Sequence, residues 1–130
     1  MANRFHVAVI IIACLIMNCA NHNPVSIQKY DEIIIVGEVY KTFSPTSDSL
    51  LPAAGVFVNL FDTDSAIYSI PKYTTQTDSF GFYAERVKPD QYSIHGQQIG
   101  FTDGNITLAI KDNQRIQIIP RIVIRQKLIQ

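Results

Sequence analysis

The sequence of 130 residues contains no tryptophan, only two cysteines, and no excess of either charge, with eleven basic and eleven acidic side chains. Because Cys14 and Cys19 both lie near the N-terminus, a disulfide framework is excluded for the rest of the chain. The balanced charge lacks the clustered basic excess of a nucleic-acid footprint, so we expect no nucleic-acid partner. The length suits one domain.

The N-terminal segment has the pattern of an export signal. Arg4 precedes an uninterrupted apolar run of eleven residues, from Val7 to Met17. A membrane-spanning helix needs about 20 apolar residues, whereas the core of a signal peptide needs only about 7–15, with a positive charge before it. We therefore predict that residues 1–18 are a signal peptide. A buried helix of the folded domain is the alternative.

The end of this run, Leu15-Ile16-Met17-Asn18-Cys19, resembles the lipobox of bacterial lipoproteins. In that family the cysteine is acylated and the chain is cut before it, so the resemblance implies a lipid anchor of several acyl chains at Cys19. Asn18 departs from the small residue that the family prefers there. The run Ile11-Ile12-Ala13-Cys14 is a competing site, and an ordinary cleaved signal peptide is the remaining alternative.

The residues after the signal read as a tether. Residues 19–30 are mostly polar and contain Pro24, which favours a linker between membrane and domain. Ala20 stands where many lipoproteins of the inner membrane carry aspartate, so the resemblance favours the outer membrane. We expect a cell-envelope protein whose first partner is the membrane, reached through its lipid anchor.

From residue 31 onward, short apolar runs alternate with turn residues about every ten positions, and no helical stripe is sustained. This pattern predicts an all-β domain over residues 31–130, a Greek-key β-sandwich of about seven strands. The expected strands cover residues 33–41, 55–61, 66–70, 73–77, 82–87, 92–96, 106–110 and 115–124.

Glycine and proline positions predict local geometry within these strands. Gly37 interrupts the first strand and indicates a bulge or a close approach. The pair Asp103-Gly104 predicts a tight turn. Pro120 predicts a kink in the last strand, at an edge or a bulge.

Five short motifs follow one another in this region: Gly37-Glu38-Val39, residues 51–58, residues 77–83, residues 87–94 and Gly100-Phe101. In this order they resemble the carboxypeptidase regulatory-like domain family, a branch of the transthyretin-like sandwiches. The resemblance implies a prealbumin-like fold and a binding or structural role. One departure is Asp90-Gln91, which stands where the family usually has glycine after the proline.

The motif residues also have a plain role in folding. Asp78 can accept hydrogen bonds from backbone amides two residues on, and Gly81 can relieve the turn that follows. We expect Phe82 and Tyr92 to place large rings on the inner faces of the sheets.

The domain contains little that points to chemistry. His95 is the single histidine after the tether, and strand alternation predicts that it faces outward with Ser93. A lone histidine does not make a metal site, and Asp62-Thr63-Asp64 lacks the further oxygen ligands of a calcium loop. No serine shows a nucleophile elbow or a base with its orienting group. We predict no enzyme activity and no cofactor.

Two relatives of the fold are disfavoured, one an enzyme and the other a stalk repeat with an internal isopeptide bond. The branch that hydrolyses hydroxyisourate uses several histidines, and the predicted domain has only His95. The stalk repeats of surface adhesins form a Lys–Asn isopeptide bond. Lys41 and Glu85 lie in suitable strands for it, but the last strand, 115–124, offers no asparagine.

The leading hypothesis is a non-enzymatic cell-envelope lipoprotein with a β-sandwich binding or structural module. A second hypothesis is a carbohydrate- or protein-binding module that acts through loops 42–54 and 62–65 at one end of the sandwich. Its candidate ligand residues are Tyr40, Phe43, Tyr68 and Tyr73. A third is an accessory domain of an envelope peptidase or receptor system. The expected ligand of such a module is a glycan or an envelope protein.

The lipid anchor can be tested directly. Cells that express the chain and are fed radiolabelled palmitate should yield a labelled band, and Cys19→Ala should abolish it because the acyl chains have lost their attachment site. Cys14→Ala is the matched control and should keep the label. Label that survives in Cys19→Ala but disappears in Cys14→Ala would instead identify Cys14 as the anchor.

Overall fold

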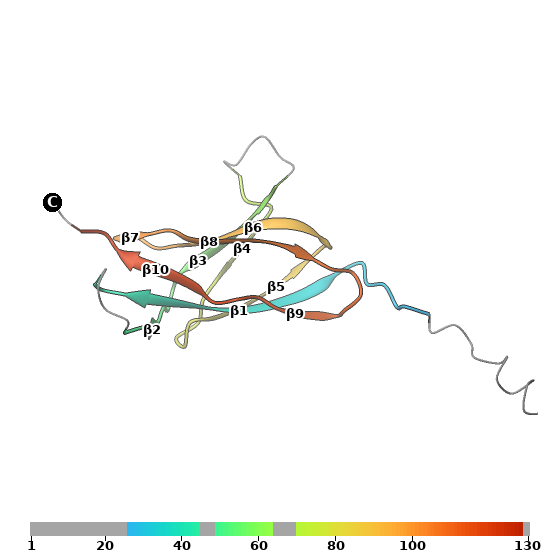
Figure 1. Ribbon diagram of the computed structural model, residues 1–130, viewed down its shortest axis with the longest axis horizontal. Helices are drawn as coiled ribbons and strands as arrows, with labels where there is room; N and C mark the ends of the chain where they lie inside the picture. The colour runs from blue at the N-terminus through green and yellow to red at the C-terminus, as the bar shows by residue number, and fades with distance from the viewer. Residues whose placement is uncertain (1–25, 45–48, 64–69, 129–130) are drawn as a thin grey trace, which may run out of the picture.

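The computed structural model describes residues 26–44, 49–63 and 70–128. These residues form ten strands in two sheets that face each other, as Figure 1 shows. The described part of the chain holds no helix that is long and apolar enough to cross a membrane. The predicted signal peptide, Cys19 and nearly all of the predicted strand 66–70 lie outside the described residues.

The predicted all-β sandwich is confirmed, with ten strands where about seven were expected. Pro120 splits the last predicted strand into two, and the short strands β2 and β7 add two more. The strands are β1 (Ile33–Thr42), β2 (Leu51–Pro52), β3 (Phe57–Asp62), β4 (Tyr73–Gln76), β5 (Phe82–Val87), β6 (Asp90–Gln97), β7 (Phe101–Thr102), β8 (Gly104–Ile110), β9 (Ile116–Ile118) and β10 (Ile122–Gln126).

The first sheet is built around β1. Strands β5 and β2 pair with it antiparallel on one side. Strands β9 and β10 pair with it parallel on the other side, and β7 then pairs with β10. Both β5 and β2 lie on the same edge, since the Val39 amide donates to Gly81 O at 2.8 Å and Val39 O accepts from the Ala53 amide at 2.9 Å.

The second sheet has the order β4-β3-β6-β8 and is antiparallel throughout. Alternate side chains of its strands point toward the first sheet, as the period of two along a strand requires. The predicted inward face of Val56, Val58 and Leu60 is confirmed, because all three are buried. The core joins apolar side chains of both sheets: Ile33, Ile35, Val39, Ala53, Val56, Val58, Leu60, Tyr83, Val87, Tyr92, Ile94, Ile110, Ile119, Ile122 and Ile124.

Gly37 marks a close approach and not a bulge. It pairs with Tyr83 inside an unbroken register between β1 and β5. A Cβ atom at residue 37 would collide with the Tyr83 ring, so glycine makes room for that ring. The expectation that Phe82 fills the inner face is wrong, because Tyr83 and Val87 occupy the inward positions of β5 and alternation leaves Phe82 outside.

The turn before β5 forms as predicted. Asp78 Oδ1 accepts hydrogen bonds from the amides of Phe80 at 2.9 Å and Phe82 at 3.0 Å. Gly81 has a φ of 81°, a conformation that other residues rarely adopt. The turn thereby starts β5 in the register that puts Tyr83 inside.

The pair Asp103-Gly104 is not the tight turn that the sequence predicts. Strand β7 before it pairs with β10 of the first sheet, and β8 after it pairs with β6 of the second sheet. The chain therefore crosses from one sheet to the other at this corner. Glycine is required because a Cβ at residue 104 would collide with the backbone of Val123.

Two buried tyrosines form a matched pair for a stability test. The Tyr92 hydroxyl donates to Lys88 O at 2.7 Å, whereas the Tyr83 hydroxyl is buried without a partner among the described residues. Burial raises the pKa of both phenols. Tyr92→Phe should lower the free energy of unfolding by about 1 kcal/mol, and Tyr83→Phe should leave it unchanged or raise it, because that change removes an unsatisfied polar atom.

Urea unfolding followed by circular dichroism would measure both variants. A loss in Tyr83→Phe equal to that in Tyr92→Phe would contradict the assignment of an unpartnered hydroxyl.

Candidate functional site

The outer face of the second sheet carries a row of polar side chains that hydrogen-bond to one another. On β3 the outward residues are Phe57, Asn59 and Phe61, which alternate with buried Val58 and Leu60. The register of neighbouring strands brings further outward side chains beside them: Thr74 on β4, Ser93, His95 and Gln97 on β6, and Asn105 and Thr107 on β8.

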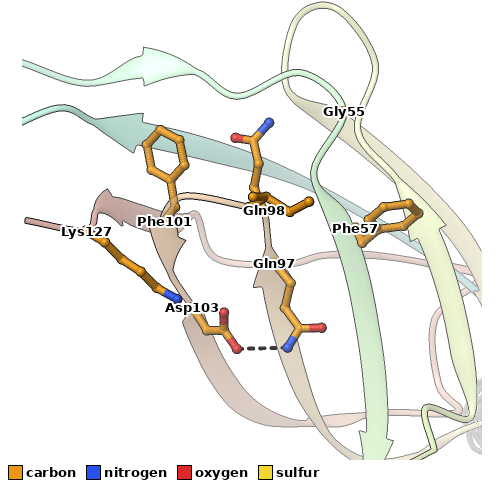
Figure 2. A pocket seen from close by; sticks show the side chains of 8 residues that line it. Gly55, Phe57, Gln97, Gln98, Phe101, Asp103 and Lys127 are labelled. Carbon is orange, nitrogen blue, oxygen red and sulfur yellow. Dashed lines mark hydrogen bonds between the residues drawn. The ribbon is translucent and has the colours of Figure 1, made fainter. Parts of the chain in front are cut away.

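A chain of hydrogen bonds runs across this face. Thr74 Oγ1 donates to Asn59 Oδ1 at 2.8 Å, and Asn59 Nδ2 donates to Gln97 Oε1 at 2.5 Å. Gln97 Nε2 donates to Asp103 Oδ2 at 2.8 Å, the contact drawn as a dashed line in Figure 2. These bonds hold rotamer-rich side chains in place, so a ligand that binds them loses less conformational entropy.

His95 lies within this face, with Ser93 and Phe61. The ring packs edge-on against Phe61, with centroids 5.1 Å apart, and its Nε2 lies 2.9 Å from Ser93 Oγ. The predicted outward direction of His95 and Ser93 is confirmed, but both are half-buried by their neighbours. Among the described residues, no carboxylate is hydrogen-bonded to the His95 ring, and no group of three or more His, Cys, Asp or Glu side chains could hold a metal ion.

Two adjoining hollows follow the face from one end to the other. One, of about 500 Å³, is lined by Phe61, Ser93, His95, Gln97, Asp103, Asn105 and Thr107. The other, of about 520 Å³ and shown in Figure 2, is lined by Gly55, Phe57, Gln97, Gln98, Ile99, Phe101, Asp103 and Lys127. Gln97 and Asp103 line both hollows, so the two form one continuous site that we call the groove.

The groove contains an acceptor that the protein leaves unused. Gln98 Oε1 is buried and has no hydrogen-bond partner among the described residues, although Gln98 Nε2 donates to Ala54 O at 3.3 Å. A buried polar atom without a partner costs free energy, so Gln98 is a strained position at the edge of the groove. The ring of Phe57 adds an apolar platform that is 53% exposed.

The aromatic residues that the sequence singles out do not converge. Tyr40 lies on the first sheet under the Arg121 guanidinium, 4.1 Å from its ring centroid. Tyr73 packs edge-on against buried Tyr92, and its hydroxyl accepts from the Lys88 amide at 3.2 Å. Tyr68 and Cys19 lie outside the described residues.

Phe43 alone approaches the groove. It is half exposed and packs edge-on against Phe101, which lines the hollow of Figure 2, with centroids 5.7 Å apart. The Lys41 ammonium lies 5.3 Å from the Phe43 ring centroid. Phe43 therefore sits beside the groove and not in a separate site.

The two loops expected at one end lie at opposite ends. Thr42 pairs with Arg125 beside β7, near the hollow that contains Phe101. Asp62 pairs with Tyr92 at the far end of β3. Residue alternation on β3 was the signal for the groove, because Phe57, Asn59 and Phe61 form an unusually aromatic and amide-rich outward face.

Comparisons with known proteins support the fold. No protein-family model matches the sequence, and no curated protein matches it. The shaft pilin SpaA of Lactobacillus rhamnosus GG is 12% identical with a TM-score of 0.54, over 75% of this chain and 52% of that one. The minor pilin GBS52 of Streptococcus agalactiae is 14% identical with a TM-score of 0.53, over 78% and 48%.

A DUF3823 family protein of Parabacteroides merdae is 12% identical with a TM-score of 0.51, over 73% of this chain and 46% of that one. The chain thus spans about half the length of these solved structures. At such identities the likeness shows the β-sandwich fold alone. Membership of the carboxypeptidase regulatory-like family stays a prediction.

Proposed function

We propose that this chain is a non-enzymatic binding protein of the cell envelope, anchored by lipid at Cys19, and that its groove binds neutral glycans. The observation that carries the proposal is the row Thr74, Asn59, Gln97 and Asp103, whose side chains are ordered by hydrogen bonds beside the exposed Phe57 ring. The binding surface is the outer face of the second sheet, in place of the loops that the sequence suggested.

The side chains of the groove match the chemistry of a sugar. Amide and hydroxyl groups both donate and accept hydrogen bonds, as sugar hydroxyls do. The ring of Phe57 can pack against the C–H face of a sugar unit, while the amide of Gln97, which lines both hollows, can bond its hydroxyls. Because the two hollows adjoin, consecutive units of one chain can occupy them.

The charges of the groove favour an uncharged ligand. Its lining includes one carboxylate, Asp103, and one ammonium, Lys127, which have opposite signs. Such a pair produces no strong net field, so a polyanion gains little by entering. The proposal therefore specifies neutral polysaccharides and not sulfated or uronic-acid polymers.

In this proposal the groove binds its ligand and catalyses no reaction on it. Ser93 and His95 are in contact, but a serine nucleophile also needs a group that orients its base and donors for the oxyanion. In the described residues no side chain beside His95 supplies the first of these. The proposal thus keeps the non-enzymatic role that the sequence predicts.

A binding assay with matched variants tests the proposal. The full chain should bind a subset of neutral oligosaccharides on a glycan array, and isothermal titration should show Phe57→Ala weakening binding about tenfold through the lost ring contact. Phe82→Ala is the control, because Phe82 is equally exposed on the opposite face of the sandwich. Dextran sulfate should not compete.

If Phe57→Ala and Phe82→Ala weaken glycan binding to the same extent, the binding site does not lie in the groove. No binding to any neutral glycan at millimolar concentration would overturn the proposal.

A further inference from the structure

The outer face of the first sheet is apolar. Along β1, Ile34 and Val36 point away from the core, and the parallel register with β9 puts Ile116 beside Ile34 and Ile118 beside Val36. On the other side of β1 the register puts Ala84 beside Val36 and Phe82 beside Glu38. We call this surface the apolar face; its members are Ile34, Val36, Phe82, Ala84, Ile116 and Ile118.

The apolar face is exposed to an unusual degree. Ile118 is 81% exposed and Ile116 is 55% exposed. The run Ile33–Val36 is apolar at every position, a pattern typical of a strand that is covered on both faces. Contiguous exposed apolar surface marks an interaction site, so something is expected to cover this face.

Arginines flank the apolar face, and two of them pair with glutamates. Arg121 bonds Glu38 with 2.9 Å between Nη2 and Oε1, and Arg86 lies 3.9 Å from Glu32. Arg115 immediately precedes β9 and adds a further positive charge. The rim therefore presents paired or positive charge, which suits a surface that carries phosphate groups.

The first residues of the domain are bonded to a segment that lies close to this face. The Tyr30 amide donates to Asp112 O at 2.8 Å, and the Lys29 ammonium lies 3.7 Å from the Asp112 carboxylate, a few residues before β9. Eleven residues lead from Cys19 to Tyr30, and a chain of that length reaches at most about 40 Å. An anchor at Cys19 therefore keeps a bilayer within reach of Ile116.

We propose that the apolar face lies on the lipid bilayer that holds the anchor, with Ile116, Ile118 and Phe82 at the boundary between headgroups and acyl chains. This inference rests on the lipid anchor of the proposed function. The long stems of the flanking arginines lie along the apolar surface while their guanidinium groups reach lipid phosphates. The anchor raises the effective concentration of the bilayer near the domain. A patch that would bind a bilayer too weakly by itself is therefore enough to hold the domain on it.

The orientation has a consequence for the groove. The hollow around His95 lies on the outer face of the second sheet, on the opposite side of the sandwich from the apolar face, and the hollow around Phe57 continues from it toward Phe101 and Lys127. A domain that rests on the bilayer through the first sheet turns the groove away from it. The apolar face thus contacts the bilayer, while the groove stays accessible to its ligand.

Site-specific fluorescence quenching tests the inference on the full lipidated chain. Ile118→Cys and the matched Thr107→Cys, on the outer face of the second sheet, each receive an environment-sensitive dye, because the proposed processing leaves no other free thiol. The protein is added to preformed vesicles of phosphatidylethanolamine and phosphatidylglycerol. Brominated lipids should reduce the emission of the dye at residue 118, and aqueous iodide should reduce that at residue 107.

A second variant separates the face from the anchor. Adding Ile116→Lys and Phe82→Lys to the Ile118→Cys chain should transfer quenching from brominated lipid to iodide, while the chain still floats with the vesicles.

The other outcomes are equally informative. Iodide quenching of both dyes in a chain that floats overturns the inference and leaves the anchor intact. A dye at residue 118 that neither quencher reaches means that a second copy of the chain covers the face, which also overturns it. A chain that does not float shows that the anchor of the proposed function is wrong, and the inference falls with it.

Discussion

The first sheet depends on the central position of β1. Its inward positions are Ile33, Ile35, Gly37 and Val39. The Tyr83 ring fills the room that the missing side chain of Gly37 leaves, so β5 is held in one register against β1. Strands β2, β5, β9 and β10 all pair with β1, and β7 joins only through β10. A slip of one residue in β1 would turn its buried isoleucines outward and change every one of these contacts.

The two sheets are joined by side chains and corners that keep them from sliding. Buried Thr77 accepts from the Val56 amide at 2.9 Å and donates to Ala53 O at 2.6 Å, which links the segments on either side of β3 and β4. Gln117 of β9 donates to Ala109 O of β8 at 3.1 Å. With the crossing at Gly104, these contacts fix the position of Asp103 beside Gln97, on which the continuity of the groove depends.

The sandwich has two outer faces of different chemistry. One carries amides, hydroxyls and aromatic rings, with several of the polar side chains ordered by hydrogen bonds, and the other carries exposed isoleucines flanked by two arginine–glutamate pairs. The buried core is made of inward residues, and Phe101 is the groove residue that packs against it. Outward residues can vary with little effect on packing, so they can encode attachment and recognition. For this reason we place both proposed roles on the outer faces.

The sequence by itself determined the all-β class, the bounds of β5, those of β1 to within one residue, the turn at Asp78 to Gly81 and an interruption at Pro120, because alternation and turn chemistry are local properties. Only the tertiary structure decided that Tyr83 and not Phe82 is buried, that Asp103-Gly104 crosses between sheets, and that the two candidate loops lie apart. The groove was likewise beyond local pattern. Its lining residues come from β3, β6, β7 and β8, from the corners beside them and from Lys127 after β10, and they meet through strand pairing between segments far apart in the chain.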